Sequence, residues 1–369
     1  MKQCSNLFPN KEAFIIFALY IILFVFQGVF VTASKTENGD YDYNTTLVVF
    51  LSELLKLVAS AFLYTYKREN KPHLFKAIVM NYELLLMYFI PSLLYCFYNN
   101  LAFINLSHYD PTSYYILLQF RVVLTALLFQ FLFKKKLGFM QWISLGILTL
   151  GCMIKNFDAA SIQSKDDSDL WSQLFNIYFL SINFQNFCSC LAGTYNEYLL
   201  KTKGSNVDIF LQNVFMYLDS VLCNFFILMF KGELGTIFED FSSLGNIFVI
   251  LITINSAVVG IVTSFFLKNL NSILKTYASA LELVITAVVC YILFSIVITP
   301  FTVLSICLVS IAVAMYFKNP VSNVTMNLSD AKDREPLLES LIITINSIIC
   351  LNSVSAGEYN LMKYMCTLI

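Results

Sequence analysis

Charged side chains are scarce in this sequence of 369 residues: Asp, Glu, Lys and Arg make up only 13%, whereas 58% of the residues are hydrophobic. One water-soluble core cannot enclose that much apolar surface, so the composition excludes a soluble globular protein and indicates an integral membrane protein. The formal net charge of -1 gives no reason to expect binding to nucleic acid.

Histidine is rare as well, and the cysteines are not spaced as metal ligands. The chain has two histidines, His73 and His108, and ten cysteines without a CxxC pair. Zinc centres use such side chains at short, regular spacings. A Gly-rich phosphate loop followed by Lys and Ser or Thr is missing too, as is a nucleophile at a useful spacing from a base. We therefore expect no metal site, no disulfide, no cofactor and no enzyme.

Long apolar runs dominate the chain. A helix needs roughly 20 apolar residues to span a bilayer. On this rule we expect an all-α membrane protein with ten transmembrane helices: Phe14–Val31, Thr46–Tyr66, Tyr82–Ile104, Thr112–Phe133, Gly138–Ile154, Trp171–Leu199, Ile209–Phe230, Ile247–Leu267, Ser272–Phe294 and Pro300–Phe317.

Basic residues collect on alternate connections between these runs. Cytosolic loops of membrane proteins are enriched in Lys and Arg. The basic connections hold Lys67, Arg68, Lys71, Lys76, Lys134 to Lys136, Lys201, Lys203, Lys268 and Lys318, while the others carry mainly Asp and Glu. The pattern predicts that both termini are cytosolic, with a short N-terminus (1–12), a region of ten helices (13–320) and a tail (321–369). The sequon at Asn44 lies so near the membrane that its glycosylation is left open.

A cation interrupts the fourth apolar run near its middle. An Arg inside a membrane helix costs at least about 2.5 kcal/mol unless it faces a partner or a watery cavity. Arg121 is therefore expected either to contact an anionic ligand or to pair with an acid, for which Glu282, Glu83 and Glu53 are available.

Two stretches of the chain match weakly when one is laid over the other. Aligning 109–128 with 270–289 places Arg121 on Glu282, Tyr115 on Thr276 and Thr125 on Thr286. Each stretch enters a helix through a polar turn and carries one ionisable group about three turns later. Halves of about 13–155 and 171–320 would each hold five helices, and an odd number inserts the second half upside down. The sequence thus favours two inverted five-helix repeats.

Several blocks resemble the nucleotide-sugar transporter family, in order and in spacing. They are YNNLAFINLSHYDPTSYYILLQFRVVLTALLF with FMQWISLGILTLGCMI after it, SELLKLV, AGTYNEYLLK, IFLQNVFMYL and FFLKNLNSILKTYASALELVITAVV. YDYNTTLVVFLSELLKLV, TYNEYLLK and FLQNVFMYL are most similar to an animal branch that includes a fly UDP-galactose carrier. The resemblance implies a ten-helix carrier of the drug/metabolite transporter fold.

The same resemblance implies an antiporter of the Golgi membrane that exchanges a cytosolic nucleotide sugar for a lumenal nucleoside monophosphate by alternating access. UDP-galactose exchanged for UMP is the first expectation, with the bilayer as the surrounding partner. UDP-N-acetylglucosamine and CMP-sialic acid stay open as substrates, as does a membrane scaffold that recruits glycosyltransferases without transport. A homodimer and an endoplasmic reticulum or endolysosomal location also stay open.

The expected substrate contacts combine the family positions with the chemistry of the ligand. A phosphate needs cations and donors, and a pyrimidine needs an aromatic to stack on and an amide to read its edge. The candidates for substrate binding are Tyr98, Asn99, Asn100, Tyr114, Tyr115, Gln119, Arg121, Asn213, Tyr217, Lys268 and Lys275. The candidates for gating or ion pairing are Glu53, Lys56, Glu197 and Glu282.

Two departures from the family pattern bear on the substrate. The family commonly has a YQLK-like run in the fourth helix, where this chain has Leu118-Gln119-Phe120-Arg121, so the cation is kept and the tyrosine is lost. The ninth helix of the family is usually rich in small residues, whereas this one carries Glu282.

Overall fold

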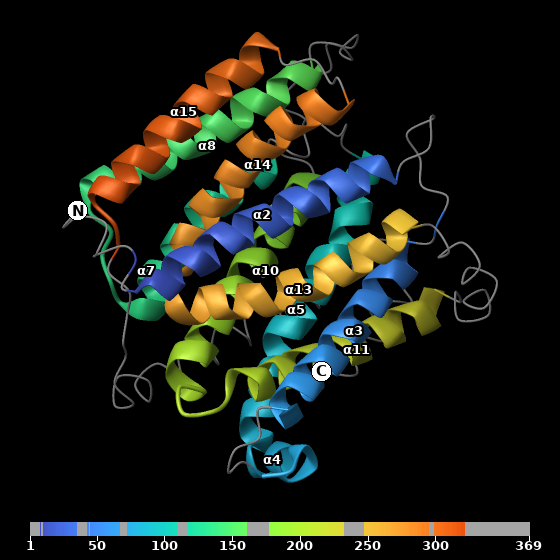
Figure 1. The fold of residues 1–369 in the computed structure, drawn as a ribbon. Coiled ribbons are helices and arrows are strands. Elements are labelled where there is room, and N and C mark those ends of the chain that lie inside the picture. Colours follow the sequence, from blue (N-terminus) through green and yellow to red (C-terminus); the bar gives the residue numbers. More distant parts are fainter. Residues whose placement is uncertain are drawn as a thin grey trace.

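All of the described secondary structure is helical (Figure 1). The structure is a computed structural model that describes residues 8, 10–34, 43, 45–66, 72–108, 117–160, 177–231, 247–294 and 299–321, apart from some side chains within these ranges. Its helices are α2 (Lys11–Ala33), α3 (Thr45–Tyr66), α4 (Leu74–Met80), α5 (Tyr82–His108), α7 (Phe120–Phe133), α8 (Phe139–Ala160), α10 (Ile177–Tyr198), the π-helix η1 (Leu199–Lys203), α11 (Ile209–Lys231), α13 (Ile247–Asn269), α14 (Ser272–Phe294) and α15 (Pro300–Lys318).

A helix overlaps each of the predicted apolar segments. Six of them, α2, α3, α11, α13, α14 and α15, are long and apolar enough to cross a bilayer by length and composition. A seventh span results if α4 and α5, which meet at an 85° bend, are taken as one broken span. The protein is therefore a multi-pass, all-helical membrane protein. The predicted segments Thr112–Phe133 and Trp171–Leu199 begin outside the described residues, and Asn44 and the tail beyond 321 lie entirely outside them.

Two elements at one end of the bundle were not foreseen in the sequence. The short helix α4 breaks away before α5, and η1 extends α10 where a loop was expected. The side chain of Gln212 closes the turn after η1: its Nε2 donates to the Gly204 carbonyl at 2.7 Å and its Oε1 accepts from Tyr88 on α5 at 2.8 Å. A π-helix is a rare interruption that often marks a functional region.

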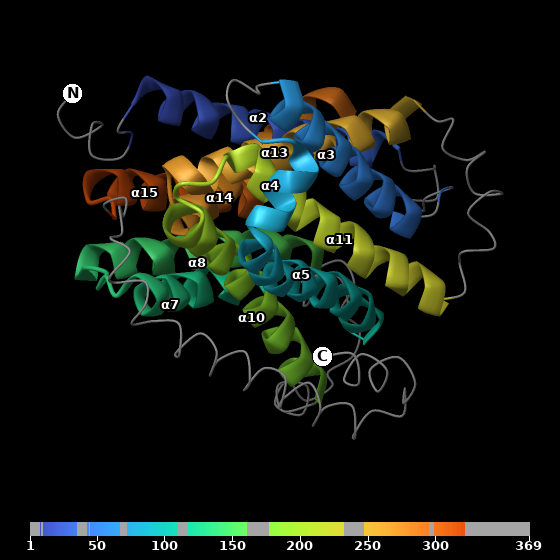
Figure 2. The ribbon, with the colours of Figure 1, turned by 90° about the horizontal axis from the view of Figure 1, so that it is seen from below.

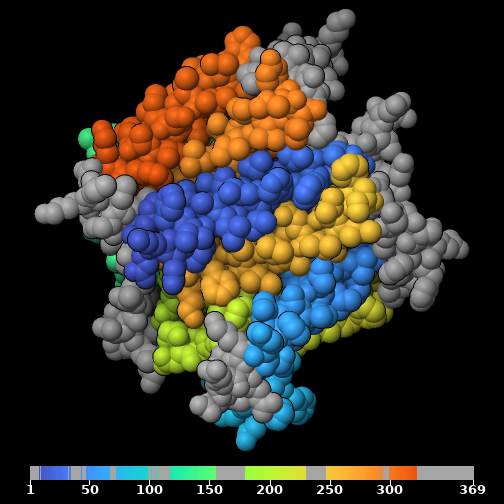
Figure 3. All heavy atoms as spheres, in the orientation of Figure 1, coloured from blue at the N-terminus to red at the C-terminus, as the bar shows by residue number. Residues whose placement is uncertain are grey.

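Helices of the first half of the chain pack mainly against helices of the second half. α13 packs against α2 and α3, α10 against α5 and α7, α11 against α3 and α5, and α15 against α8. Figure 2 shows α5, α7, α8 and α10 on the side of the molecule opposite to α2 and α13. Figure 3 shows α2, α13, α14 and α15 side by side on one face. Among the large apolar residues that α2 and α13 expose are Ile15 and Ile254. A face of this kind suits contact with lipid.

Helices α8 and α15 approach closely at Gly151. A Cβ atom added there would lie 3.1 Å from Leu308 Cβ and 3.3 Å from the backbone nitrogen of Val309, so α15 would have to shift. Overpacking of this kind costs typically about 1–3 kcal/mol. We expect Gly151→Ala to lower the unfolding temperature of the detergent-solubilised protein by several degrees.

Gly146 on the same helix is the matched control for this substitution. A Cβ atom at Gly146 would meet nothing within 4 Å, and alanine is the better helix former by about 1 kcal/mol. Gly146→Ala should leave the unfolding temperature unchanged or raise it. Equal effects of the two substitutions would contradict the close approach.

Candidate functional site

One group of predicted residues meets between α2, α7 and α14. The charges of Arg121 on α7 and Glu282 on α14 both act on Tyr20 of α2, whose hydroxyl hydrogen-bonds with Ser279. The charge of Arg121 also acts on Lys275, two turns before Glu282 on α14. Tyr20 is buried, while Arg121, Lys275 and Glu282 are half-buried. Three ionisable side chains from two predicted repeats therefore share one region.

A second group lies between α3, α11 and α13. Lys56 Nζ donates to Glu53 Oε1 at 2.7 Å and lies 5.6 Å from the centre of the Tyr217 ring, and Tyr217 hydrogen-bonds with Ser264. Helices α3 and α11 can approach α13 because residue 260 of α13 is glycine. A Cβ atom at this position would lie 2.8 Å from the Tyr217 hydroxyl. Glu53 and Lys56 keep 16% and 15% of their side chains exposed.

Tyr95 on α5 connects the two groups. It is within electrostatic range of Tyr20 and Glu53, and of Tyr98 and Cys190 as well. We call the combined set of Tyr20, Glu53, Lys56, Tyr95, Arg121, Tyr217, Lys275 and Glu282 the interhelical polar cluster. Six helices contribute to it: α2, α3, α5, α7, α11 and α14.

The charges of the interhelical polar cluster suit an anion. The ion pairs among the described residues are Lys56 with Glu53 and Lys201 with Glu197, so Arg121 and Lys275 belong to neither. Of the three acids proposed as partners of Arg121, Glu53 is taken by Lys56. The backbone of Arg121 is held in place: its carbonyl accepts from Thr125 at 2.7 Å and from Cys190 on α10 at 3.2 Å. Two cations close enough for the charge of one to act on the other can hold a phosphate group between them.

The other residues predicted to contact substrate are not part of the interhelical polar cluster. Tyr98 is half-buried near Tyr95, Gln119 is buried just before α7, and Asn213 is buried with an Nδ2 that has no hydrogen-bond partner among the described residues. Lys268 lies apart, near Asp208 at the start of α11. Tyr114 and Tyr115, and the side chains of Asn99 and Asn100, lie outside the described residues.

Glu197, one of the candidates for gating or ion pairing, is not a surface residue. Its side chain is completely buried at the end of α10, where Oε1 accepts from Lys201 Nζ at 2.7 Å and Oε2 accepts from the Ser272 backbone N–H at 2.7 Å. Lys201 Nζ also donates to the carbonyl of Leu270. A carboxylate at a helix N-terminus is favoured by the helix dipole. This network, the Glu197 clamp, joins α10 and η1 to the first turn of α14.

Sequence reasoning missed Tyr20, Tyr95 and Ser264. The chain has 21 tyrosines in mostly apolar surroundings, and hydropathy does not distinguish a tyrosine that faces other helices from one that faces lipid. No spacing in the sequence would have singled them out.

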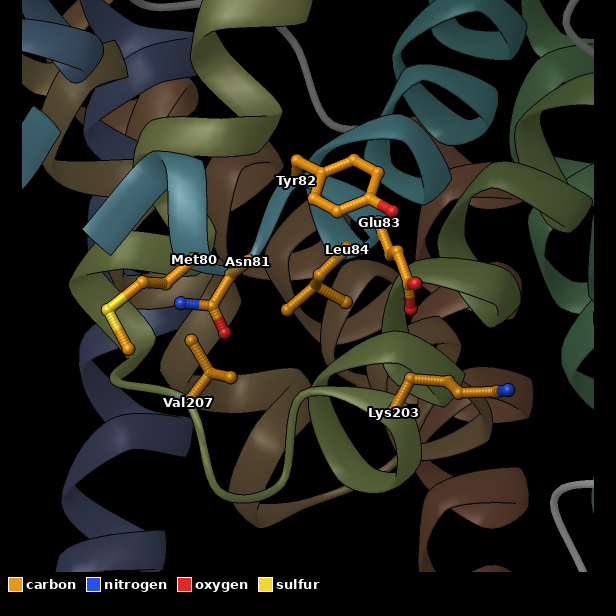
Figure 4. A pocket seen from close by; sticks show the side chains of 7 residues that line it. All are labelled: Met80, Asn81, Tyr82, Glu83, Leu84, Lys203 and Val207. Atoms are coloured by element: carbon orange, nitrogen blue, oxygen red, sulfur yellow. The ribbon is translucent and has the colours of Figure 1, made fainter. Parts of the chain in front are cut away.

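A separate pocket lies where α4 meets α5. It has a volume of about 300 Å³ and is lined by Met80, Asn81, Tyr82, Glu83, Leu84, Lys203 and Val207. In Figure 4, Met80 and Val207 lie on one side of the pocket and Glu83 and Lys203 on the other. None of these lining residues was predicted to bind substrate, and we do not assign substrate to this pocket.

Comparisons with known proteins agree with the resemblance seen in the sequence. The chain is 48% identical to the UDP-galactose transporter senju of Drosophila melanogaster, over 91% of this chain and 95% of the fly protein. It is 30% identical to CMP-sialic acid transporter 1 of Oryza sativa subsp. japonica, over 82% of this chain and 94% of the rice protein.

A solved crystal structure shares the fold. It superposes with a TM-score of 0.59, covering 83% of this chain and 96% of the other, at 10% sequence identity.

The family model for nucleotide-sugar transporters matches residues 10–317, which is nearly all of the described part of the chain. The family resemblance is thereby confirmed, and this chain belongs to the nucleotide-sugar transporter family.

Proposed function

We propose that this protein is a Golgi antiporter that carries UDP-galactose into the lumen in exchange for UMP. The observation that carries the proposal is the pair Arg121 and Lys275 in the interhelical polar cluster, two neighbouring cations that lie in neither of the described ion pairs. UDP-galactose is favoured because the fly relative at 48% identity is named a UDP-galactose transporter. CMP-sialic acid is the second candidate, because the rice relative at 30% identity is named for it.

An inverted repeat would supply the two facings that exchange requires, and the packing of the helices supports it. The helices of the first half, α2, α3, α5, α7 and α8, can be matched in order with those of the second half, α10, α11, α13, α14 and α15. Under this matching, three contacts between helices correspond to three other observed contacts: α2–α13 to α10–α5, α3–α13 to α11–α5, and α2–α14 to α10–α7. The contacts α3–α11, α7–α14 and α8–α15 return to themselves. This correspondence is what two five-helix halves related by a two-fold axis would produce, so it supports the proposed inverted repeat. Ten spans with both termini cytosolic are part of the same proposal.

The interhelical polar cluster would be the substrate site between these halves. Arg121 and Lys275 would hold the phosphates. Arg121 is aligned with Glu282 in the comparison of 109–128 with 270–289, and the helices that carry them, α7 and α14, are in contact. Tyr98, Asn99, Asn100, Gln119, Asn213 and Tyr217 would stack on or hydrogen-bond with the base, with Tyr114 and Tyr115 as further contacts. Rocking of the halves about the cluster would then expose it first to the cytosol and then to the lumen.

The Glu197 clamp would act as a gate on the cytosolic side. It lies among Lys201 and Lys203, in a connection whose basic residues predict a cytosolic location. While the clamp is formed, α10 and the start of α14 are held together. Opening toward the cytosol would require α14 to move away from Glu197.

Counterflow tests this function directly. Purified protein in liposomes loaded with UMP should take up UDP-galactose faster than the same liposomes without UMP, because an antiporter returns only when loaded. Absence of any stimulated uptake by correctly folded protein would favour the alternative, a scaffold that gathers glycosyltransferases.

Ligand-dependent stability should identify the base. A ligand present at about 100 times its Kd stabilises the folded state by about 2.7 kcal/mol. We expect UDP-galactose and UMP to raise the unfolding temperature more than CMP-sialic acid, CMP or a GDP sugar at equal concentration. A larger shift with the CMP ligands would move the assignment to CMP-sialic acid within the same family.

A further inference from the structure

Glu282 is an acid in a region that is otherwise suited to anions. Its charge and that of Arg121 both act on Tyr20, and the Thr286 hydroxyl lies 3.5 Å from its Oε1. Helix α2 passes close by, because a Cβ added at Gly28 would lie 3.2 Å from the Thr286 methyl group. Glu282 therefore lies on α14 one turn before the contact with α2, in a helix that also contacts α7.

Glu282 and the cation Lys275 lie on the same helix, α14, at some distance from one another. It follows Lys275 by seven residues, which is two turns and about 10.5 Å of helix on the same face. The charge of Arg121, on the contacting helix α7, acts on Lys275 and, together with the charge of Glu282, on Tyr20. Along α14 the cation Lys275 therefore comes first and the carboxylate Glu282 follows two turns later.

A UDP-hexose carries the complementary groups in the same order. Its diphosphate is anionic, and the sugar attached to it is neutral and rich in hydroxyl donors. A carboxylate accepts hydrogen bonds from such donors, and these bonds are stronger than those between neutral groups. The same carboxylate repels a sugar that carries its own carboxylate, and repulsion of a competitor is an effective source of specificity.

Resting on the proposed function, we infer that Glu282 is a specificity-determining residue that admits neutral sugars and rejects acidic ones. With the diphosphate on Arg121 and Lys275, the sugar extends along α14 to Glu282, with Ser279, Thr286 and Tyr20 as neighbouring hydroxyls.

The test compares two substrates that differ at one carbon. UDP-galactose and UDP-galacturonic acid share base, ribose, diphosphate and ring stereochemistry, and differ in a hydroxymethyl or a carboxylate group at C6 of the sugar. In UMP-loaded proteoliposomes, wild-type protein should transport UDP-galactose at least about tenfold faster than UDP-galacturonic acid, as expected for two like charges within one poorly solvated site. Glu282→Gln should lower this ratio at least about fivefold, because the repulsion disappears while the size of the side chain is kept.

Two control variants separate charge from shape. Glu282→Asp keeps the charge and should keep most of the discrimination, and Glu83→Gln removes an exposed acid near α4 and should leave the ratio at the wild-type value. If Glu282→Gln transports too slowly to measure, the shifts in unfolding temperature produced by the two sugars give the same ratio in detergent.

The outcomes are distinguishable. Equal transport of the two sugars by the wild type, or a ratio unchanged in Glu282→Gln, overturns the inference and leaves the antiport function standing. Wild-type protein that exchanges neither sugar for UMP contradicts the proposed function, and the inference falls with it.

Discussion

Arg121→Ala protein should retain no more than a few per cent of wild-type UDP-galactose uptake in UMP-loaded proteoliposomes. The substitution removes a planar, charged donor from the interhelical polar cluster. Of the two cations that were assigned to the phosphates, Lys275 remains. Removing one partner of a buried, hydrogen-bonded charge pair costs about 2–5 kcal/mol, which corresponds to a loss of about 30-fold or more in affinity. Arg121→Lys should keep part of the activity, because a point charge remains but the bidentate fork is lost.

The control for Arg121→Ala is Lys76→Ala on α4. Lys76 is exposed and lies outside the interhelical polar cluster, so this variant should transport at the wild-type rate. The variants must be compared at equal amounts of folded protein, as judged by their unfolding temperatures without ligand. Folded Arg121→Ala protein with undiminished uptake would remove Arg121 from the substrate site.

Glu197→Ala should be the most destabilising of the substitutions considered. It leaves the Lys201 ammonium, 6% exposed, without its counter-ion and the Ser272 N–H without its acceptor. Loss of one partner from a buried ion pair costs about 3–5 kcal/mol. The unfolding temperature of the solubilised protein should therefore fall well below that of Gly151→Ala, and counterflow should fall with it.

A double substitution tests whether the Glu197 clamp is the cause. In Glu197→Ala with Lys201→Met, no unpaired buried cation remains, so the unfolding temperature should recover part of the loss. Glu197→Gln should lie between wild type and Glu197→Ala, because an amide oxygen can still accept from Ser272. Glu83→Ala removes an exposed acid and should change little. Additive effects of Glu197→Ala and Lys201→Met would show that the two side chains do not act as a pair.

The local course of the chain was largely predictable. Apolar runs long enough to span a bilayer are easily recognised, and a helix overlaps each of them in the structure. The elements that escaped prediction, α4 and η1, are short and depend on contacts made by residues distant in sequence. Gln212, for example, joins the turn at Gly204 to Tyr88, which is 124 residues away along the chain.

The candidate site was predictable for its charges but not for its tyrosines. An ionisable side chain in an apolar helix is conspicuous because membrane insertion penalises it, and Arg121, Lys275 and Glu282 were found in this way. Tyr20 and Tyr95 carry no such penalty and look the same as tyrosines that face lipid. Their membership in the interhelical polar cluster depends on the rotation of α2 and α5 about their axes, which only neighbouring helices determine.

The sequence by itself determined that this protein is a membrane protein of helices, which family it resembles, and which charges its helices carry, because those properties follow from composition and order along the chain. Only the tertiary structure decided that Arg121, Lys275 and Glu282 share one region, and that Glu197 is buried against Lys201 and the start of α14. The physical reason is that such encounters join helices far apart in the chain, so they depend on how the helices pack against one another.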